Sequence, residues 1–126
     1  MITWNNLDKL TSYQELEKTE SVDLAAVMAG ENGAERVKNY SVPMAEGLAY
    51  NYAAKKVDDT VLAALEKLAE EAQLTEKFEA LYNGEVVNTG EKRLVLHHMT
   101  RGQLGDAVEA DGVDKRTFYV EQQKKI

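Results

Sequence analysis

The stretch from residue 58 to residue 72 constrains the fold most, because its apolar side chains recur with the period of an α-helix. One face of that helix carries Val61, Leu62, Leu65, Leu68, Ala69 and Ala72, and the opposite face carries Glu66, Lys67, Glu70 and Glu71. Carboxylates at Asp58 and Asp59 fall in the first turn, where they favour the positive end of the helix dipole. We therefore predict an amphipathic helix over residues 58–72, with a solvated charged face.

Shorter helices are predicted before this one. Apolar residues at three-residue spacing indicate a helix over residues 7–16, with Ser12 and Glu15 as a capping box for its later part. A second helix is predicted from about Val22 to Ala29 with Gly30 as its stop, and a further helical turn over residues 34–39. The segment from Tyr40 to Tyr52 instead alternates with period two around Pro43 and Gly47. It predicts a small hairpin, and a helix over residues 45–54 is the alternative.

Three further segments follow the long helix. Thr75 is expected to cap a short helix that reaches Tyr82 and is closed by Asn83-Gly84. Residues 89–96 leave two alternatives, a helix capped by Thr89 or a buried strand over residues 94–96. Asp114 is the expected cap of a last helix, in which Val113 and Phe118 have the spacing of a hydrophobic staple.

The last helix reaches Ile126 without a glycine, a proline or a polar tail. Helices in natural domains usually end at such a signal, so we expect the natural chain to continue after residue 126. The fold is thus predicted to be mostly α with a small β-hairpin element. Apolar side chains at Phe118, Tyr119, Val120 and Ile126 would seek a partner.

Composition limits the partners of this chain. Its 126 residues carry a formal charge of −7, and an acidic surface repels nucleic-acid phosphates and anionic lipids. There is no cysteine, which excludes disulfides and thiolate chemistry and fits a cytosolic protein. The N-terminus has no secretory pattern, and no stretch reaches the roughly 20 apolar residues that span a bilayer. We expect a cytoplasmic protein without nucleic-acid or membrane partners.

No catalytic or metal-binding set can be assembled from these residues. Adjacent side chains at His97 and His98 point in different directions on a helix or a strand, so one is expected to be packed and the other exposed. The densest basic points, Lys92-Arg93, Arg101 and Lys115-Arg116, lack the glycine-rich loop that cradles a phosphate. We therefore predict no catalytic residue, no metal and no cofactor within this segment.

The stretch from Leu81 to His97, Leu-Tyr-Asn-Gly-Glu-Val-Val-Asn-Thr-Gly-Glu-Lys-Arg-Leu-Val-Leu-His, resembles the glucose-6-phosphate isomerase family. The matching positions are Tyr82, Asn83, Gly84, Glu85, Asn88, Glu91, Arg93, Val95, Leu96, His97 and Arg101. Upstream, the acidic helix and the tyrosine at position 52 are also similar, so the resemblance covers roughly residues 22–103. The sequence departs from the family at residues 51–54, which read Asn-Tyr-Ala-Ala, and at residues 98–104, which puts the role of Arg101 in doubt.

The resemblance implies that residues 1–126 are the N-terminal, mainly helical segment of a longer enzyme. That enzyme would have a three-layer α/β sandwich of the sugar-isomerase type, with its sugar-phosphate-binding domains after residue 126. The family interconverts glucose 6-phosphate and fructose 6-phosphate without a metal, as a carboxylate base moves a proton between two carbons through an enediol. A homodimer is also implied, with this segment as scaffolding that is inactive alone.

Arg93 corresponds to an arginine of the family motif, and the resemblance implies a place near the substrate or a role in holding this segment on the catalytic domain. An ion pair with Glu85 or Glu91 is the local alternative. For the whole chain, the rival hypothesis is a free-standing acidic helical module whose last helix docks on a protein partner.

Overall fold

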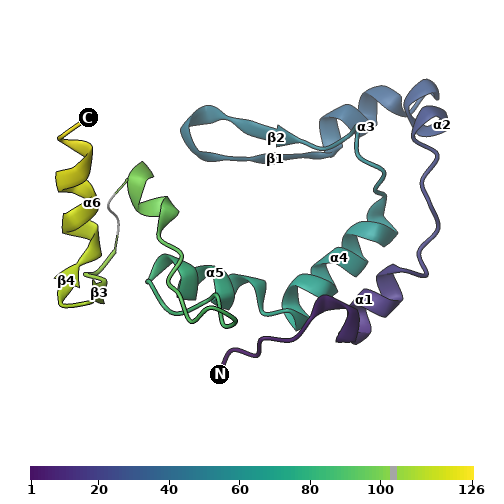
Figure 1. The fold of residues 1–126 in the computed structure, drawn as a ribbon. Coiled ribbons are helices and arrows are strands. Elements are labelled where there is room, and N and C mark those ends of the chain that lie inside the picture. The colour runs from purple at the N-terminus through teal and green to yellow at the C-terminus, as the bar shows by residue number, and fades with distance from the viewer. Residues whose placement is uncertain (103–104) are drawn as a thin grey trace. The chain divides into compact units, whose positions relative to one another are not determined.

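The computed structural model describes residues 1–102 and 105–126. The chain forms two compact units, one of residues 7–68 and one that combines residues 1–6 with residues 69–126 (Figure 1). Within the described residues no helix is both long enough and apolar enough to cross a lipid bilayer.

The unit of residues 7–68 consists of short helices and one hairpin. In chain order its elements are η1 (Leu7–Lys9), α1 (Thr11–Leu16), α2 (Leu24–Ala29), α3 (Gly33–Asn39), β1 (Ser41–Pro43), η2 (Ala45–Gly47), β2 (Ala49–Asn51) and the first part of α4 (Asp59–Glu71). Its buried apolar residues, Leu10, Val22 and Ala53, come from the segments between these elements.

The predicted helices of this unit are present, with one error at a helix start. The Asp23 side chain accepts a hydrogen bond from the Ala26 N–H at 3.1 Å and so caps α2, which Gly30 follows as expected. The capping box at Ser12 and Glu15 is wrong. Leu10 is buried in an extended conformation and is the N-cap of α1, so Ser12 falls inside the helix.

Strands β1 and β2 form the predicted antiparallel hairpin, in which Val42 pairs with Tyr50 (Figure 1). The turn needs left-handed backbone, with φ of 59° at Glu46 and 73° at Gly47. Beyond the strands, the Tyr52 N–H donates to the Tyr40 carbonyl at 2.8 Å and extends the pairing toward α3. The alternative of a helix over residues 45–54 is therefore wrong.

Helix α4 confirms the amphipathic prediction to within a residue at each end. Asp58 caps it by accepting the Val61 N–H at 2.8 Å. None of its residues is buried, and Leu65 on the apolar face is 39% exposed. The apolar stripe of this helix is therefore only partly covered.

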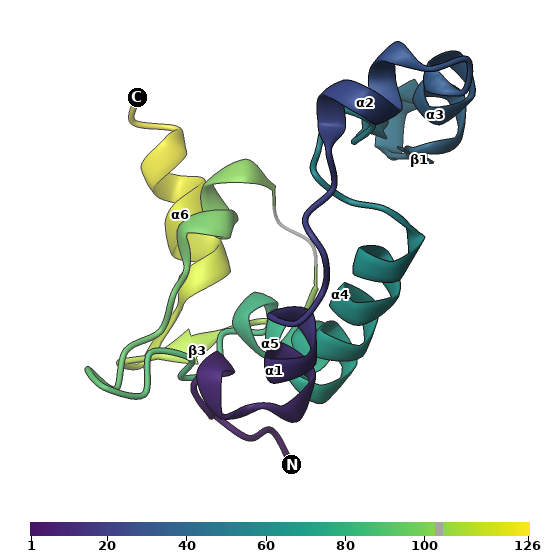
Figure 2. The same ribbon diagram turned by 90° about the vertical axis from the view of Figure 1, so that its right-hand side faces the viewer.

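The unit that ends at Ile126 contains α5 (Leu74–Tyr82), η3 (His97–Arg101), β3 (Glu109–Ala110), β4 (Val113–Asp114) and α6 (Lys115–Gln123) (Figures 1 and 2). Its buried core is formed by Ala80, Met99, Val108 and the side chain of Arg116. The Gln123 side chain donates to the Thr100 carbonyl, which ties α6 to η3.

Helix α5 ends as predicted but begins differently. Gly84 has φ of 76°, and its N–H donates to the Leu81 carbonyl at 3.2 Å, so Asn83-Gly84 closes the helix. The predicted cap at Thr75 is wrong, because the N-cap is Gln73 in the left-handed conformation. The Gln73 side chain instead accepts the Thr3 N–H at 2.8 Å and so holds the N-terminal residues.

Both predictions for residues 89–96 are wrong. The last helix is confirmed, but it ends at Gln123 and does not reach Ile126. Residues 94–96 have no regular structure, and the segment before them is a turn closed by a bridge between Asn88 and Arg93. Asp114 caps α6 through the N–H groups of Arg116 and Thr117, at 3.1 and 3.3 Å. The described residues are thus mainly helical with two short hairpins, which confirms the predicted class.

The second hairpin, β3–β4, is absent from the predictions. Each of its strands has two residues, too few to show a period-two pattern. Its turn carries the one usable signal, since Asp111-Gly112 is a strong hairpin dipeptide and both residues have positive φ, 55° and 73°.

Candidate functional site

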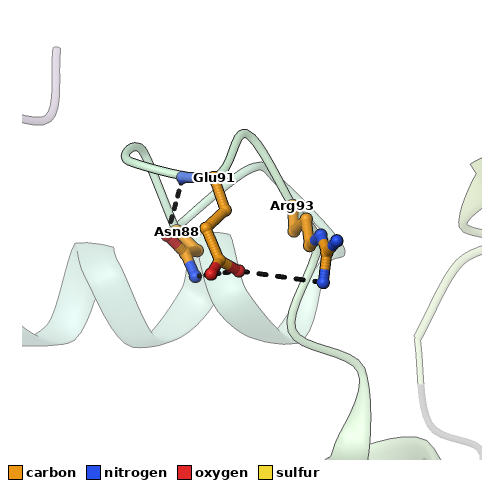
Figure 3. A network of polar contacts seen from close by, with 3 residues as sticks. All are labelled: Asn88, Glu91 and Arg93. Atoms are coloured by element: carbon orange, nitrogen blue, oxygen red, sulfur yellow. Dashed lines mark hydrogen bonds and ion pairs between the residues drawn. The ribbon is translucent and has the colours of Figure 1, made fainter.

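The loop that carries Arg93 is held by its own polar groups (Figure 3). Asn88 and Arg93 exchange backbone hydrogen bonds at 3.3 and 3.2 Å, which close the turn. The Asn88 side chain accepts the Glu91 N–H at 3.1 Å and donates to the Glu91 carboxylate at 3.3 Å. Lys92 has a left-handed φ of 55°, which directs the chain back toward Asn88. The motif residues Asn88, Glu91 and Arg93 therefore form one local unit.

The guanidinium of Arg93 faces solvent in this segment. Its side chain is 76% exposed, and Nη1 lies 3.8 Å from Oε2 of Glu91. The local alternative is thus partly confirmed, since the ion pair forms with Glu91, and Glu85 makes none with the residues described. An exposed pair of this kind contributes about 0–1 kcal/mol, so the fold does not need Arg93 for its stability.

His97 and His98 confirm the expectation that one is exposed and the other packed. His98 stacks on Tyr82 with ring centroids 4.9 Å apart, and its Nε2 lies 3.1 Å from the Tyr82 carbonyl oxygen. His97 is exposed at the start of η3. Across residues 1–102 and 105–126, no three His, Cys, Asp or Glu side chains are grouped to hold a metal ion.

Arg116, at the start of α6, binds the end of α5, where the motif begins. Arg116 is 6% exposed, donates through Nη2 to the Tyr82 carbonyl at 2.9 Å and through Nε to the Asp106 carbonyl, and lies over the Tyr82 ring. The sequence marked Lys115-Arg116 only as a dense basic point and gave no sign that Arg116 is buried. The neighbouring Lys115 side chain is 21% exposed, and its Nζ lies 3.5 Å from the carboxylate of Asp111.

A second buried arginine, Arg36, was missed altogether. It is 9% exposed, and its guanidinium donates to three backbone carbonyls, those of Ala53, Lys55 and Val57, at 2.9, 3.0 and 2.7 Å. It also lies 4.2 Å from the centroid of the Tyr40 ring. The four-residue spacing from Arg36 to Tyr40 was the available signal, because such residues are neighbours on a helix face.

The side chains of Tyr40 and Asp114 have pKa values shifted from their ordinary values. Desolvation and the hydrogen bond to Asp59, at 2.9 Å, raise the pKa of the Tyr40 phenol. The Thr117 hydroxyl, which donates to the Asp114 carboxylate, is the main cause that lowers the pKa of Asp114. Both side chains make local contacts within the fold: Tyr40 holds the start of α4 through Asp59, and Asp114 caps α6.

Arg101 ends η3 and is exposed. The motif departures at positions 103 and 104 lie outside the described residues. The geometry thus supplies one ordered, solvent-facing cation, Arg93, on a closed loop, and no catalytic set among the residues described.

Comparisons with known proteins agree with the motif. The sequence model of the family described as phosphoglucose isomerase matches residues 51–126. A glucose-6-phosphate isomerase of Treponema denticola is 52% identical over 128 residues, which cover 98% of this chain and 24% of that protein. The enzyme of that name from Treponema pallidum is 39% identical, with 99% of this chain and 24% of that protein covered.

A solved structure shows the same likeness in three dimensions. The crystal structure of a glucose-6-phosphate isomerase from Chlamydia trachomatis matches with a TM-score of 0.73 and 28% identity, covering 96% of this chain and 24% of that one. The chain therefore spans about a quarter of the length of these relatives, and the matched part is their N-terminal portion. By sequence and by fold, this chain belongs to the phosphoglucose isomerase family.

Proposed function

We propose that this chain is the N-terminal segment of a glucose-6-phosphate isomerase, which interconverts glucose 6-phosphate and fructose 6-phosphate. The observation that carries the proposal is the motif at residues 81–101, folded as a closed loop on α5, in a chain 52% identical to a protein of that name. The glycolytic and gluconeogenic role follows from that reaction. The full-length enzyme would act in the cytoplasm as a homodimer, without a metal, a nucleic acid or a membrane.

Within that enzyme the segment has a scaffolding role. The described residues contain buried arginines that bind backbone carbonyls, but no nucleophile, base and oxyanion stabiliser in reach of one another. The catalytic and sugar-phosphate-binding α/β domains would be in the three-quarters of the relatives' length that this chain does not cover. Residues 1–126 alone would bind the remainder of the chain and would not catalyse.

Arg93 is proposed as the residue of this segment that lies toward the substrate or supports the catalytic domain. Its side chain is exposed here, while its backbone is fixed by the bridge to Asn88, so the charge is presented from a defined position. A cation held in this way is suited to a sugar phosphate or to a carboxylate of the catalytic domain.

An isomerase assay on the full-length protein tests the proposal. Fructose 6-phosphate is supplied, and glucose 6-phosphate is followed with a coupled dehydrogenase. The full-length chain is expected to turn over, and residues 1–126 alone are expected to give no rate above the blank. A folded full-length chain without activity would overturn the proposal.

A further inference from the structure

The hairpin β1–β2 has one apolar face that the described residues leave uncovered. Because side chains alternate along a strand, the even-numbered residues share a face, and the pairing of Val42 with Tyr50 places both strands in that register. That face carries Tyr40, Val42, Met44, Leu48, Tyr50 and Tyr52, which we call the hairpin face. Val42, Met44, Leu48 and Tyr50 are 45%, 57%, 65% and 48% exposed.

The hairpin face continues into a groove of the same unit. A hollow of about 400 Å³ is lined by Val42, Tyr50, Tyr52, Lys55, Val57, Leu62 and Leu65. Its floor is therefore built from the hairpin and from the apolar stripe of α4, which is itself only partly covered. Lys55 is the charged residue among those that line it. Exposed apolar surface of this extent marks an interaction site rather than a scatter of single residues.

The root of the hairpin face is held rigidly. The Tyr40 and Tyr52 rings are 5.3 Å apart, and Tyr50 stacks on Tyr52 at 6.1 Å. Arg36 lies against Tyr40 and anchors the segment after β2 through three carbonyls. Since these side chains are already ordered, covering them costs less conformational entropy than covering a mobile surface.

We propose that the downstream part of the same isomerase chain packs against the hairpin face and its groove. This inference rests on the proposed function, because relatives of which this chain spans 24% carry about three times as much further sequence. A second copy of this chain is the other candidate occupant, and the mass of a crosslinked product distinguishes it from the downstream part of the same chain. The occupant would be an apolar element with a carboxylate near Lys55.

Photo-crosslinking of the full-length protein tests whether the downstream chain packs on the hairpin face. In one variant p-benzoylphenylalanine replaces Tyr50 on the hairpin face, and in a second variant it replaces Leu48. If one variant does not fold, the other still tests the proposal. The matched control replaces Ala49, which is exposed in the same strand and points to the opposite face. After irradiation, the products are separated under denaturing conditions and the linked peptides are sequenced by mass spectrometry.

The expected result is a crosslink from position 50 or 48 to a peptide beyond residue 126, in a product with the mass of a single chain. The control with the photo-reactive residue at position 49 is expected to give no such crosslink. A product of twice that mass would overturn the proposal in favour of a second copy. Absence of any crosslink from both face positions in a folded protein would also overturn it, because the face would then be open to water. Isomerase activity is assayed in parallel. An active enzyme without the crosslink refutes only the proposed packing on the hairpin face, and a crosslink without activity refutes only the proposed function.

Discussion

At the scale of single residues, buried guanidinium groups organise this chain where apolar side chains are few. Arg36 binds three carbonyls of the segment that follows β2, and Arg116 joins α6 to the end of α5. Each carbonyl would otherwise lose its water without a protein partner, which costs about 1–3 kcal/mol per group. These two side chains therefore take the place of a larger core in their units.

Replacing Arg36 with methionine is expected to destabilise the unit of residues 7–68 by about 3 kcal/mol, because three acceptors are left without donors. Denaturant unfolding and hydrogen exchange of the amides in that unit provide the measurement. Lys38→Met is the matched control, since Lys38 is an exposed cation on the same helix that pairs with Glu35. An Arg36→Met protein as stable as the control would contradict the assignment.

Arg93, unlike Arg36, is expected to matter for activity and not for stability. Arg93→Ala should change stability by less than about 0.5 kcal/mol, because the side chain is 76% exposed and its ion pair is weak. In the full-length enzyme the same change should lower kcat/KM about tenfold, as for the loss of one charge-assisted hydrogen bond. Lys92→Ala, which removes the neighbouring charge, is the control and should leave the rate unchanged. Equal rates for the two variants would refute the proposed role.

At the scale of secondary-structure elements, the ends of the helices are set by single side chains and by left-handed residues. Asp114 caps α6 as predicted. Asp58 and Asp23 also cap helices, although both were predicted to lie inside the first turn. Gln73 was not predictable in this way. Its left-handed backbone accompanies hydrogen bonds to residues about 70 positions earlier, which no local pattern encodes.

The cap of α6 gives a pH prediction. Because the folded pKa of Asp114 is lowered, its stabilising effect is present above the unfolded value of 3.8 and is lost as the pH falls through the folded pKa. The Arg116 and Thr117 amides should therefore exchange faster below that pH, after correction for intrinsic rates. In Asp114→Asn, which still caps but does not titrate, this acid-induced loss should disappear. Identical pH profiles for the two proteins would show that the cap is not responsible.

Gly84 closes α5 at a place where a side chain has no room. Its φ is 76°, and a Cβ there would overlap the Val108 side chain in the core of the unit. Gly84→Ala is expected to cost about 1–3 kcal/mol, from the left-handed backbone and the overpacking together. Gly90→Ala should be near neutral, because a Cβ there would lie 3.8 Å from Oδ1 of Asn88, which is an ordinary contact. Thermal unfolding of the two variants compares them directly, and equal midpoints would contradict the packing described.

At the scale of the whole molecule, the sequence predicted the family and the fold class better than it predicted the local contacts. The motif at residues 81–101 identifies the family because it is ordered and unusual in residue type, and the helix at 58–72 is plain from its period. The loop at residues 88–93 was not predictable, because Leu94, Val95 and Leu96 fit a helix or a strand equally well. The burial of Arg36 and Arg116 depends on partners 10 to 34 residues away.

Apolar side chains remain exposed in both units of the chain. Phe118 on the last helix and Ile126 after it are exposed, at 41% and 108%, as expected of partner-seeking residues. Tyr119 and Val120 are half-buried. Together with the hairpin face, they show that each unit of this chain retains apolar surface beyond its own small core. A segment of a larger enzyme is expected to have this character, because its remaining partners are in the rest of the chain.

The most direct test of the central claim is the isomerase rate of the full-length protein compared with a variant that lacks residues 1–126. We predict that the full-length protein equilibrates glucose 6-phosphate and fructose 6-phosphate, and that the deletion abolishes this activity because the catalytic domains lose their scaffold. An inactive but folded full-length protein, or a deletion variant that retains the full rate, would contradict the account.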